Sequence, residues 1–210
     1  MKELTPRQKE QRARVLAGTR ELLAEQGYDG LQMRVLAERC GVSTMTLYNR
    51  FGNKDDLILV ALQELLGSLA AETNASGKRG IEELLDLASR TADQILATPQ
   101  YAQAMASMLF NAQPDSPICQ TLLVAVIDES RNFIEQMLKL GELNNSVDTE
   151  LLVRNLGVCR WSAILLWMKQ IHTDAEFKAQ YVCAPILTLA PAMTPKTRAI
   201  YAPKLAKLSL

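Results

Sequence analysis

The sequence predicts an all-α protein built from two helical domains, and three observations support this fold class. The chain of 210 residues is 48% hydrophobic but only 5% aromatic, and it is rich in the helix formers Leu, Ala and Met. Apolar residues recur at helical spacing almost from end to end, without the alternation expected of a strand. A polar stretch with two glycines, NASGKRG at residues 74–80, interrupts this pattern. We therefore expect an N-terminal domain over residues 9–70, a larger helical domain over 80–190, and a C-terminal tail over 191–210.

Start and stop signals divide the chain into helices. Thr5 before Pro6 is typical of an N-cap followed by proline at the first helical position, and Gly27 ends the first helix. A short second helix is expected over residues 31–39, ending at Gly41. Further helices are expected from Asn53, which caps the fourth, and then over 81–96, 101–111, 117–140, 148–171 and 174–189. Pro185 should kink or end the last of these, and we expect a loosely ordered tail.

Charge and cysteine content exclude several classes of protein. The formal net charge is zero, but residues 1–60 hold ten Lys and Arg against eight Asp and Glu, a weak excess of +2 that mildly favours DNA binding there. The four cysteines form no CxxC pair and the chain has one histidine, so we expect a reduced, cytoplasmic protein without a metal or another cofactor. The longest apolar run is too short to span a bilayer and the N-terminus is charged, so no membrane partner or secretory signal is expected.

The third predicted helix has an unusual pattern of exposed polar groups. In the stretch GVSTMTLYNRF, Ser43 is a plausible N-cap, and Val42 and Leu47 occupy the positions of a hydrophobic staple. At 100° per residue, Leu47 and Phe51 share one face. Met45, Thr46 and Asn49 point away from it, and Thr44, Tyr48 and Arg50 lie on the flanks. Two short helices joined by a glycine turn describe a helix-turn-helix, here over residues 32–51.

This face suits the major groove of DNA. Thr46 would contact a thymine methyl group or a base acceptor, Met45 a thymine methyl group, and Asn49 an adenine. Tyr48, Arg50 and Lys54 would donate to phosphate oxygens, and main-chain donors at residues 53–55 would add to that contact. The alternative is a polar surface helix in an ordinary bundle, although the glycine turn, the staple and the cap of the next helix coincide here.

These residues resemble the DNA-binding domain of the TetR family of bacterial transcriptional regulators. The similar features over residues 9–70 are Gly27-Tyr28, Leu36-Ala37, Gly41-Val42-Ser43, Leu47-Tyr48, Phe51, Lys54 and Leu57. The resemblance implies that DNA is contacted by Gln32, Arg34, Ser43, Thr44, Met45, Thr46, Tyr48, Asn49, Arg50 and Lys54. It also implies a dimer with a C-terminal ligand-binding and dimerisation domain. One departure is Gln32, where the family usually has a capping Thr. Gln32 then contacts the DNA backbone differently, or Asp29 substitutes for the cap.

The C-terminal domain offers candidate effector contacts, each with a structural alternative. Tyr101, Met105, Met108 and Phe110 form a Met-rich apolar set that would line a ligand cavity or simply fill the core. Arg160 lies in an apolar helix and needs a partner, either an anionic ligand or a carboxylate such as Glu129 or Asp93.

The last two long predicted helices carry more apolar residues than one monomer would bury. We expect a four-helix interface between two copies, with Leu152, Leu156, Ile164 and Trp167 in the contact. Two-fold symmetry would place the two reading helices one DNA turn apart, about 34–36 Å.

Together these features predict a homodimeric repressor that binds a double-stranded DNA operator and is released by an unknown small-molecule effector. The alternative is a DNA-binding protein that works without an effector or through a partner protein. A helical enzyme is disfavoured, because the sequence has no paired carboxylates, nucleophile–base set or phosphate-binding loop.

Overall fold

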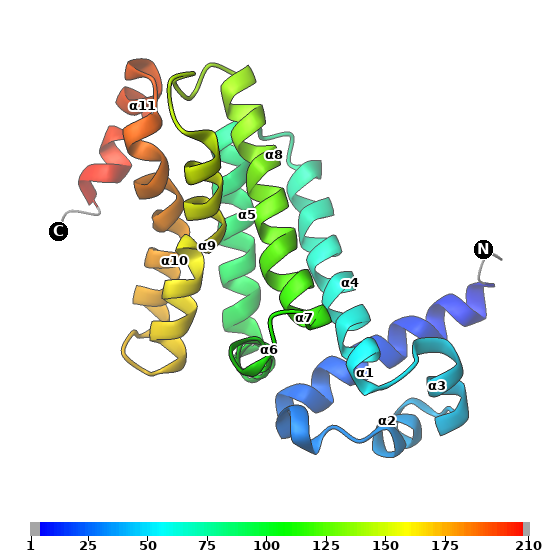
Figure 1. Ribbon diagram of the computed structural model, residues 1–210. Coiled ribbons are helices and arrows are strands. Elements are labelled where there is room, and N and C mark those ends of the chain that lie inside the picture. The colour runs from blue at the N-terminus through cyan, green and yellow to red at the C-terminus, as the bar shows by residue number, and fades with distance from the viewer. Residues whose placement is uncertain (1–4, 208–210) are drawn as a thin grey trace. The chain divides into compact units, whose positions relative to one another are not determined.

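The structure is a computed structural model that describes residues 5–207 (Figure 1). Within that range the chain is helical, and its extended segments meet only in one antiparallel bridge, between Leu143 and Met193. The prediction of an all-α fold is confirmed. The chain forms two compact units: unit 1 comprises residues up to 68 together with 97–118, and unit 2 comprises 69–96 together with the residues from 119 onward. The boundary falls inside a helix after residue 68, and the polar stretch at 74–80 lies within unit 2.

Unit 1 begins with α1 (Pro6–Gly30), whose N-terminus has the predicted cap. Thr5 and Gln8 form a reciprocal capping box, with Thr5 Oγ1 accepting from the Gln8 backbone N–H at 3.3 Å. Gly27 leaves the helical region with φ 68° and ψ −174°, so the long helix ends there and one further turn follows. The other helices are α2 (Met33–Cys40), α3 (Thr44–Phe51), the first part of α4 (Lys54–Ala75) and α6 (Pro99–Asn111).

The core of unit 1 forms where α1 packs against α6 and α2. Its largest fully buried side chains are Leu16, Leu22, Leu23, Leu31, Leu36, Leu47, Leu57 and Ile58. The approach of α1 to α2 depends on Gly18, because a Cβ atom there would lie 2.9 Å from Cys40 Sγ and 3.3 Å from a methyl group of Leu36. The small residue therefore sets how closely the two helices pack.

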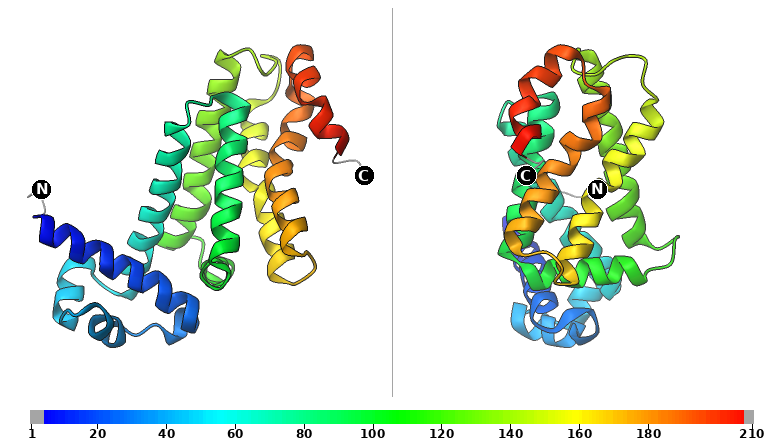
Figure 2. Two further views of the ribbon diagram at one scale, coloured as in Figure 1. Left: turned by 180° about the vertical axis from the view of Figure 1, so that it is seen from behind. Right: turned by 90° about the vertical axis from the view of Figure 1, so that its left-hand side faces the viewer.

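Unit 2 is a bundle in which α5 (Gly80–Ala97), α8 (Ala125–Lys139), α9 (Thr149–Met168) and α10 (Asp174–Leu189) run side by side (Figure 2). The predicted helix over 117–140 is one helical run with an irregular start: α7 (Pro117–Cys119), a π-helical segment η1 (Gln120–Val124), and then α8. Asp148 caps α9 through a bond from the Leu151 N–H to Asp148 Oδ1 at 3.0 Å. The helix α10 continues beyond Pro185 to Leu189, so this proline does not end it.

The expectation of a loosely ordered tail is wrong for the described part of it. A 3-10 turn η2 (Ala190–Ala192) leads into α11 (Pro195–Lys207), which lies beside the end of α10 (Figure 1). The backbone of residues 142–144 pairs with that of 192–194, with N–H to O distances of 2.9 Å from Asn144 to Ala192 and 3.0 Å from Thr194 to Glu142. Tyr201 is buried as well. Long-range pairing of this kind leaves no local sequence signal.

Among residues 5–207, one helix, α9, is long and apolar enough to cross a membrane by length and composition alone, and 39% of its most apolar 18-residue stretch is buried within the structure. A core helix passes the same test. The buried side of α9 includes Val153, Leu156, Ala163 and Trp167, all packed within the unit. Exposed Arg154 and Asn155 lie within the same span.

The role of Gly18 gives a direct test of the α1–α2 packing. Gly18→Leu would insert a side chain where Cys40 and Leu36 already lie, so we expect the free energy of unfolding to fall by about 1–3 kcal/mol. Gly67→Leu in α4 is the matched control, since apart from the neighbouring residues and backbone of α4 itself no atom among the described residues lies within 4 Å of that Cβ position. There a better helix former should raise stability by about 0.5–1 kcal/mol. Urea denaturation followed by circular dichroism measures both, and equal effects at the two sites would contradict the packing argument.

Candidate nucleic-acid interface

The helix α3 is held to unit 1 by two side chains. Leu47 and Phe51 are 1% and 6% exposed, and they are the buried residues of this eight-residue helix. The guanidinium carbon of Arg12, from α1, lies 5.5 Å from the centre of the Phe51 ring. The predicted anchoring face is therefore the face that packs.

The turn between α2 and α3 fixes where α3 starts. Gly41 adopts the left-handed conformation at φ 63° and ψ 41°, which a side chain would disfavour. The N–H groups of Gly41 and Val42 donate to the carbonyls of Glu38 and Ala37 at 3.2 and 3.0 Å. Ser43 then caps α3 by accepting the Thr46 backbone N–H at 3.1 Å. Tight turn and cap together make a helix-turn-helix of the predicted extent.

The opposite side of α3 is open. Met45 is 67% exposed and Tyr48 is 50% exposed, and Asn49 and Arg50 are exposed too. Thr44 and Thr46 are half-buried, and Ser43 is exposed at the start. The structure therefore brings the predicted reading residues onto one accessible surface, which we call the α3 face: residues 43–46 and 48–50.

The two predicted DNA contacts at the start of α2, Gln32 and Arg34, differ in the bonds that their side chains make. Gln32 takes the N-cap position of α2 but makes no side-chain capping bond, which fits the expectation that Gln caps poorly. Arg34 is exposed and pairs with Glu38 one turn later, at 3.1 Å. An exposed pair of this type contributes little energy, so the guanidinium can exchange Glu38 for another anion.

Arg50 is oriented by a residue that the sequence analysis did not single out. Its Nη1 donates to Gln11 Oε1 at 2.5 Å, which links α3 to α1. The two residues are 39 positions apart, so no spacing rule could have found the contact. Gln11 therefore acts as a positioning residue for the Arg50 guanidinium.

Lys54 is also held by the protein. Its ammonium donates to the backbone carbonyl of Tyr28 at 2.7 Å and lies 3.9 Å from the centre of the Tyr28 ring. The Tyr28 hydroxyl in turn donates to Asp55 Oδ1 at 2.6 Å, and this hydrogen bond raises the pKa of Tyr28 to about 12. An ammonium has three N–H donors, so Lys54 keeps donors for a phosphate while it ties α4 to the end of α1.

One of the predicted main-chain donors at residues 53–55 is engaged within the protein. Asn53 caps α4, as expected, because its Oδ1 accepts the Asp56 N–H at 2.9 Å. The Asn53 N–H, however, donates to Asp56 Oδ2 at 3.1 Å, and Asp55 and Asp56 add negative charge to the first turn. The two carboxylates would oppose an incoming phosphate, although the Lys54 and Asp55 positions still offer main-chain N–H groups. The phosphate contact at residues 53–55 stays a prediction.

The predicted effector residues belong to both units. Tyr101 and Met105 are buried in unit 1, Met108 is half-buried, and Phe110 is 49% exposed. The Tyr101 hydroxyl is buried without a hydrogen-bond partner among residues 5–207, and burial raises its pKa to about 12. An unpaired buried hydroxyl calls for an explanation, which an ordered water or a ligand would provide.

Arg160 lies in unit 2 and has the carboxylate partner that was predicted. Its Nη2 is 3.9 Å from Glu129 Oε2 on α8, and its guanidinium carbon is 5.6 Å from the centre of the Tyr181 ring. Burial raises the pKa of Glu129, and Arg160 opposes that shift. Asp93, the other predicted partner, pairs with Lys178 instead. The ion-pair alternative for Arg160 therefore applies, with Glu129 as its partner.

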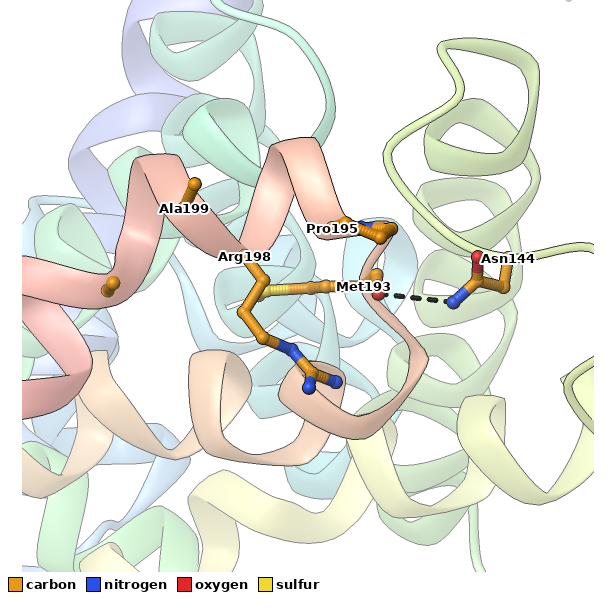
Figure 3. Close-up of a pocket in the computed structure, with 6 residues that line it drawn as sticks. Asn144, Met193, Pro195, Arg198 and Ala199 are labelled. Carbon is orange, nitrogen blue, oxygen red and sulfur yellow. Dashed lines mark hydrogen bonds between the residues drawn. The ribbon is translucent and has the colours of Figure 1, made fainter.

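The described part of unit 2 also has an open hollow beside α11 (Figure 3). It is lined by Asn144, Met193, Pro195, Arg198, Ala199 and Ala202. Asn144 Nδ2 donates to the Met193 carbonyl at 3.1 Å, and Arg198 Nη2 donates to the Ala190 carbonyl at 2.7 Å. These polar groups hold η2 and α11 in place. The hollow shares no residue with the predicted effector set.

The predicted dimer residues are mostly inside the protomer. Leu156, Ile164 and Trp167 are buried at 0%, 8% and 6% exposure, and Leu152 is half-buried against the unit 2 core. Trp167 packs on Phe177 and donates its indole N–H to Asp174 Oδ1 at 2.8 Å. The exposed side of α9 instead carries Leu151, Val158 and Leu165, at 57%, 48% and 40% exposure. The spacing of seven residues between them was visible in the sequence and was overlooked.

Known proteins are similar to this chain in the same helix-turn-helix region. The family model for bacterial regulatory proteins of the TetR family matches residues 15–61. The transcriptional repressor KstR of Rhodococcus jostii is 32% identical over 99 residues, which is 47% of each chain, so the match spans about half of that relative. The transcriptional regulatory protein RaaS of Mycobacterium tuberculosis is 23% identical over 167 residues, covering 80% of this chain and 76% of that protein.

A solved structure extends the likeness of the fold over most of the chain. SmeT, the repressor of a multidrug efflux pump of Stenotrophomonas maltophilia, superposes with a TM-score of 0.71 at 16% identity, over 89% of this chain and 92% of that one. At this identity the likeness shows the fold alone. With the matched helix-turn-helix, the comparisons lead to one conclusion: residues 15–61 form a domain of the TetR family of bacterial regulatory proteins.

Proposed function

We propose that this protein is a sequence-specific, DNA-binding transcriptional regulator that acts in the cytoplasm as a homodimeric repressor. The observation that carries the proposal is the division of α3 into a buried edge and an open polar face. Leu47 and Phe51 are buried, whereas Met45, Tyr48, Asn49 and Arg50 are exposed. A helix held in this way presents its outer side to the major groove. The names of the relatives, which are transcriptional repressors and regulators, support a regulatory role rather than an enzymatic one.

The contacts divide into two classes by chemistry. Arg50, Tyr48 and Lys54 carry donors at the edge of the α3 face and would bind phosphate oxygens, and Gln32, Arg34, Ser43 and Thr44 would extend that contact. Met45, Thr46 and Asn49 would face the bases. Phosphate contacts set affinity and register, and base contacts set sequence preference.

A homodimer would use the exposed stripe of α9, defined here as Leu151, Val158 and Leu165. Residues seven apart lie on one side of a helix, so the three apolar side chains share that side, with the exposed polar residues Asn155 and Ser162 between them. A two-fold axis along this strip would bury it against its own copy, since such an interface is self-complementary. This replaces Leu156, Ile164 and Trp167 as interface candidates, because their side chains already pack within the protomer.

Release by a small molecule is the regulatory part of the proposal. Tyr101 and Met105 provide a buried hydroxyl without a partner and a flexible apolar side chain, which suit a largely apolar effector with one polar group. The effector would act by binding more tightly to the dimer state that cannot engage two half-sites. The alternative, a regulator without an effector or with a protein partner, predicts that no metabolite changes operator affinity.

The first prediction concerns phosphate binding by Arg50. We expect Arg50→Ala to weaken binding to operator and to unrelated duplexes by similar factors, and to reduce the slope of log K against log salt by about one. Lys196→Ala is the control, because it removes one exposed positive charge from α11 in unit 2. Fluorescence anisotropy at several salt concentrations measures both slopes. An unchanged slope for Arg50→Ala would remove Arg50 from the phosphate contacts.

The second prediction concerns the α9 stripe. We expect Val158→Glu combined with Leu165→Glu to yield monomers, because two carboxylates per protomer would face each other across the proposed two-fold axis. Ile200→Glu, which changes an even more exposed apolar residue on α11, should leave the dimer intact. Sedimentation velocity reports the mass, and circular dichroism checks that each variant is folded. A folded dimer of the double variant would show that copies meet elsewhere.

The third prediction concerns Tyr101. Tyr101→Phe removes only the buried, unpaired hydroxyl, so we expect the melting temperature to stay the same or rise. An effector found by screening metabolites against the operator complex should release the variant only at higher concentration. Tyr201→Phe, at a buried tyrosine of α11, is the control and should respond as the wild type does. Equal effector responses in all three proteins would exclude the Tyr101 hydroxyl as a contact.

A further inference from the structure

Met45 is placed unlike any other large apolar side chain of α3. Its two apolar neighbours on the helix, Leu47 and Phe51, are buried in unit 1, whereas Met45 is 67% exposed. It lies at the middle of the α3 face, between the cap and the exposed Tyr48. A flexible thioether side chain is well suited to apolar contact with an irregular surface. On a DNA-reading helix, the apolar group available to it in the major groove is the 5-methyl group of thymine.

Thr46 lies next to Met45 on the α3 face and is half-buried. Its hydroxyl lies 2.8 Å from the Ser43 hydroxyl, and the Ser43 oxygen also accepts the Thr46 N–H at 3.1 Å. The bond between the two hydroxyls holds the Thr46 oxygen at the cap and so favours one staggered rotamer of the side chain. The γ-methyl group then occupies another position around Cβ. Ser43 is thus a positioning residue for Thr46 in addition to capping the helix.

From this arrangement we infer that Met45 and Thr46 read thymine by its methyl group, and that each half-site of the operator holds thymines within about two base pairs of the adenine bound by Asn49. The inference rests on the proposed DNA-binding function and specifies which chemistry selects the sequence. Met45 and Asn49 are four residues apart, about 6 Å along a helix axis, which is about two base-pair steps of 3.4 Å. At these positions the protein would contact apolar groups of the bases. The Thr46 hydroxyl bonds to the Ser43 hydroxyl instead of to a base.

The test uses duplexes that differ by single methyl groups. An operator is first selected from a random pool with the full-length protein, and each thymine in a half-site is then replaced by deoxyuridine, which removes the methyl group and leaves pairing unchanged. We expect two positions per half-site at which the change weakens binding about fourfold. That factor corresponds to about 0.8 kcal/mol per buried methyl-sized group.

Protein variants connect each position to one side chain. Thr46→Ser keeps the hydroxyl and removes only the γ-methyl group, so it should no longer distinguish thymine from deoxyuridine at one of the two positions. Thr46→Val keeps a methyl group and should retain part of that discrimination. Met45→Ala should abolish discrimination at the other position, and the double-mutant cycle between side chain and base methyl isolates the contact. Thermal unfolding of each variant checks that the fold is intact.

The outcomes separate this inference from the function on which it rests. If the protein binds its operator but deoxyuridine has no effect at any position, DNA binding stands and methyl readout is wrong. If deoxyuridine weakens wild type, Met45→Ala and Thr46→Ser alike, another group reads the methyl and the assignment is overturned. If no duplex is selected at all, the proposed function fails and the inference fails with it.

Discussion

The packing of Leu47 and Phe51 is the constraint on which the rest of unit 1 depends. A helix of eight residues is not stable alone in water, because nucleation costs more than so few hydrogen bonds return. Burying these two side chains contributes about 1.5–3 kcal/mol each, and the Ser43 cap adds about 1 kcal/mol. Of the other six residues of α3, Thr44 and Thr46 are half-buried and the remaining four are exposed. This division explains how a short helix keeps a fixed position while presenting an almost uncovered polar side.

The positively charged side chains around α3 are also held in place by the protein. Arg50 and Lys54 are long side chains, and ordering each on DNA would cost about 0.5–1.5 kcal/mol if they moved freely in the unbound protein. Gln11 and the Tyr28 carbonyl already restrict them, so part of that cost is met during folding. The acidic first turn of α4 has the opposite effect, because Asp55 and Asp56 weaken the positive end of the helix. Attraction to phosphate therefore depends on a few oriented side chains instead of a general positive field, in keeping with a net charge of zero.

The sequence could predict those parts of the structure that depend on interactions between residues close together in the chain. Caps and turns depend on residues within about four positions, so Thr5, Gly41, Ser43, Asn53 and Asp148 could be placed correctly from the sequence alone. The open side of α3 followed from helical periodicity. Contacts between distant residues could not be predicted: Gln11 with Arg50, Lys54 with the Tyr28 carbonyl, and the pairing of 142–144 with 192–194 that orders α11. The acidic residues after Asn53 are visible in the sequence, but the hydrogen bond from the Asn53 N–H to Asp56 depends on the local geometry of the cap.

The helix α9 shows a different limit, because both of its sides are apolar. Periodicity identifies a helix but cannot decide which of two apolar sides faces the core. The structure buries the side that contains Arg160 and leaves Leu151, Val158 and Leu165 outside, the reverse of the usual rule that charges face water. Arg160 can be buried because Glu129 and the Tyr181 ring, from α8 and α10, lie beside it. The outer side has no such partner within the described residues of the protomer. In the proposed homodimer, a second copy of the chain would cover these exposed apolar side chains by symmetry, while the opposite side of the same helix stays in the core of the protomer.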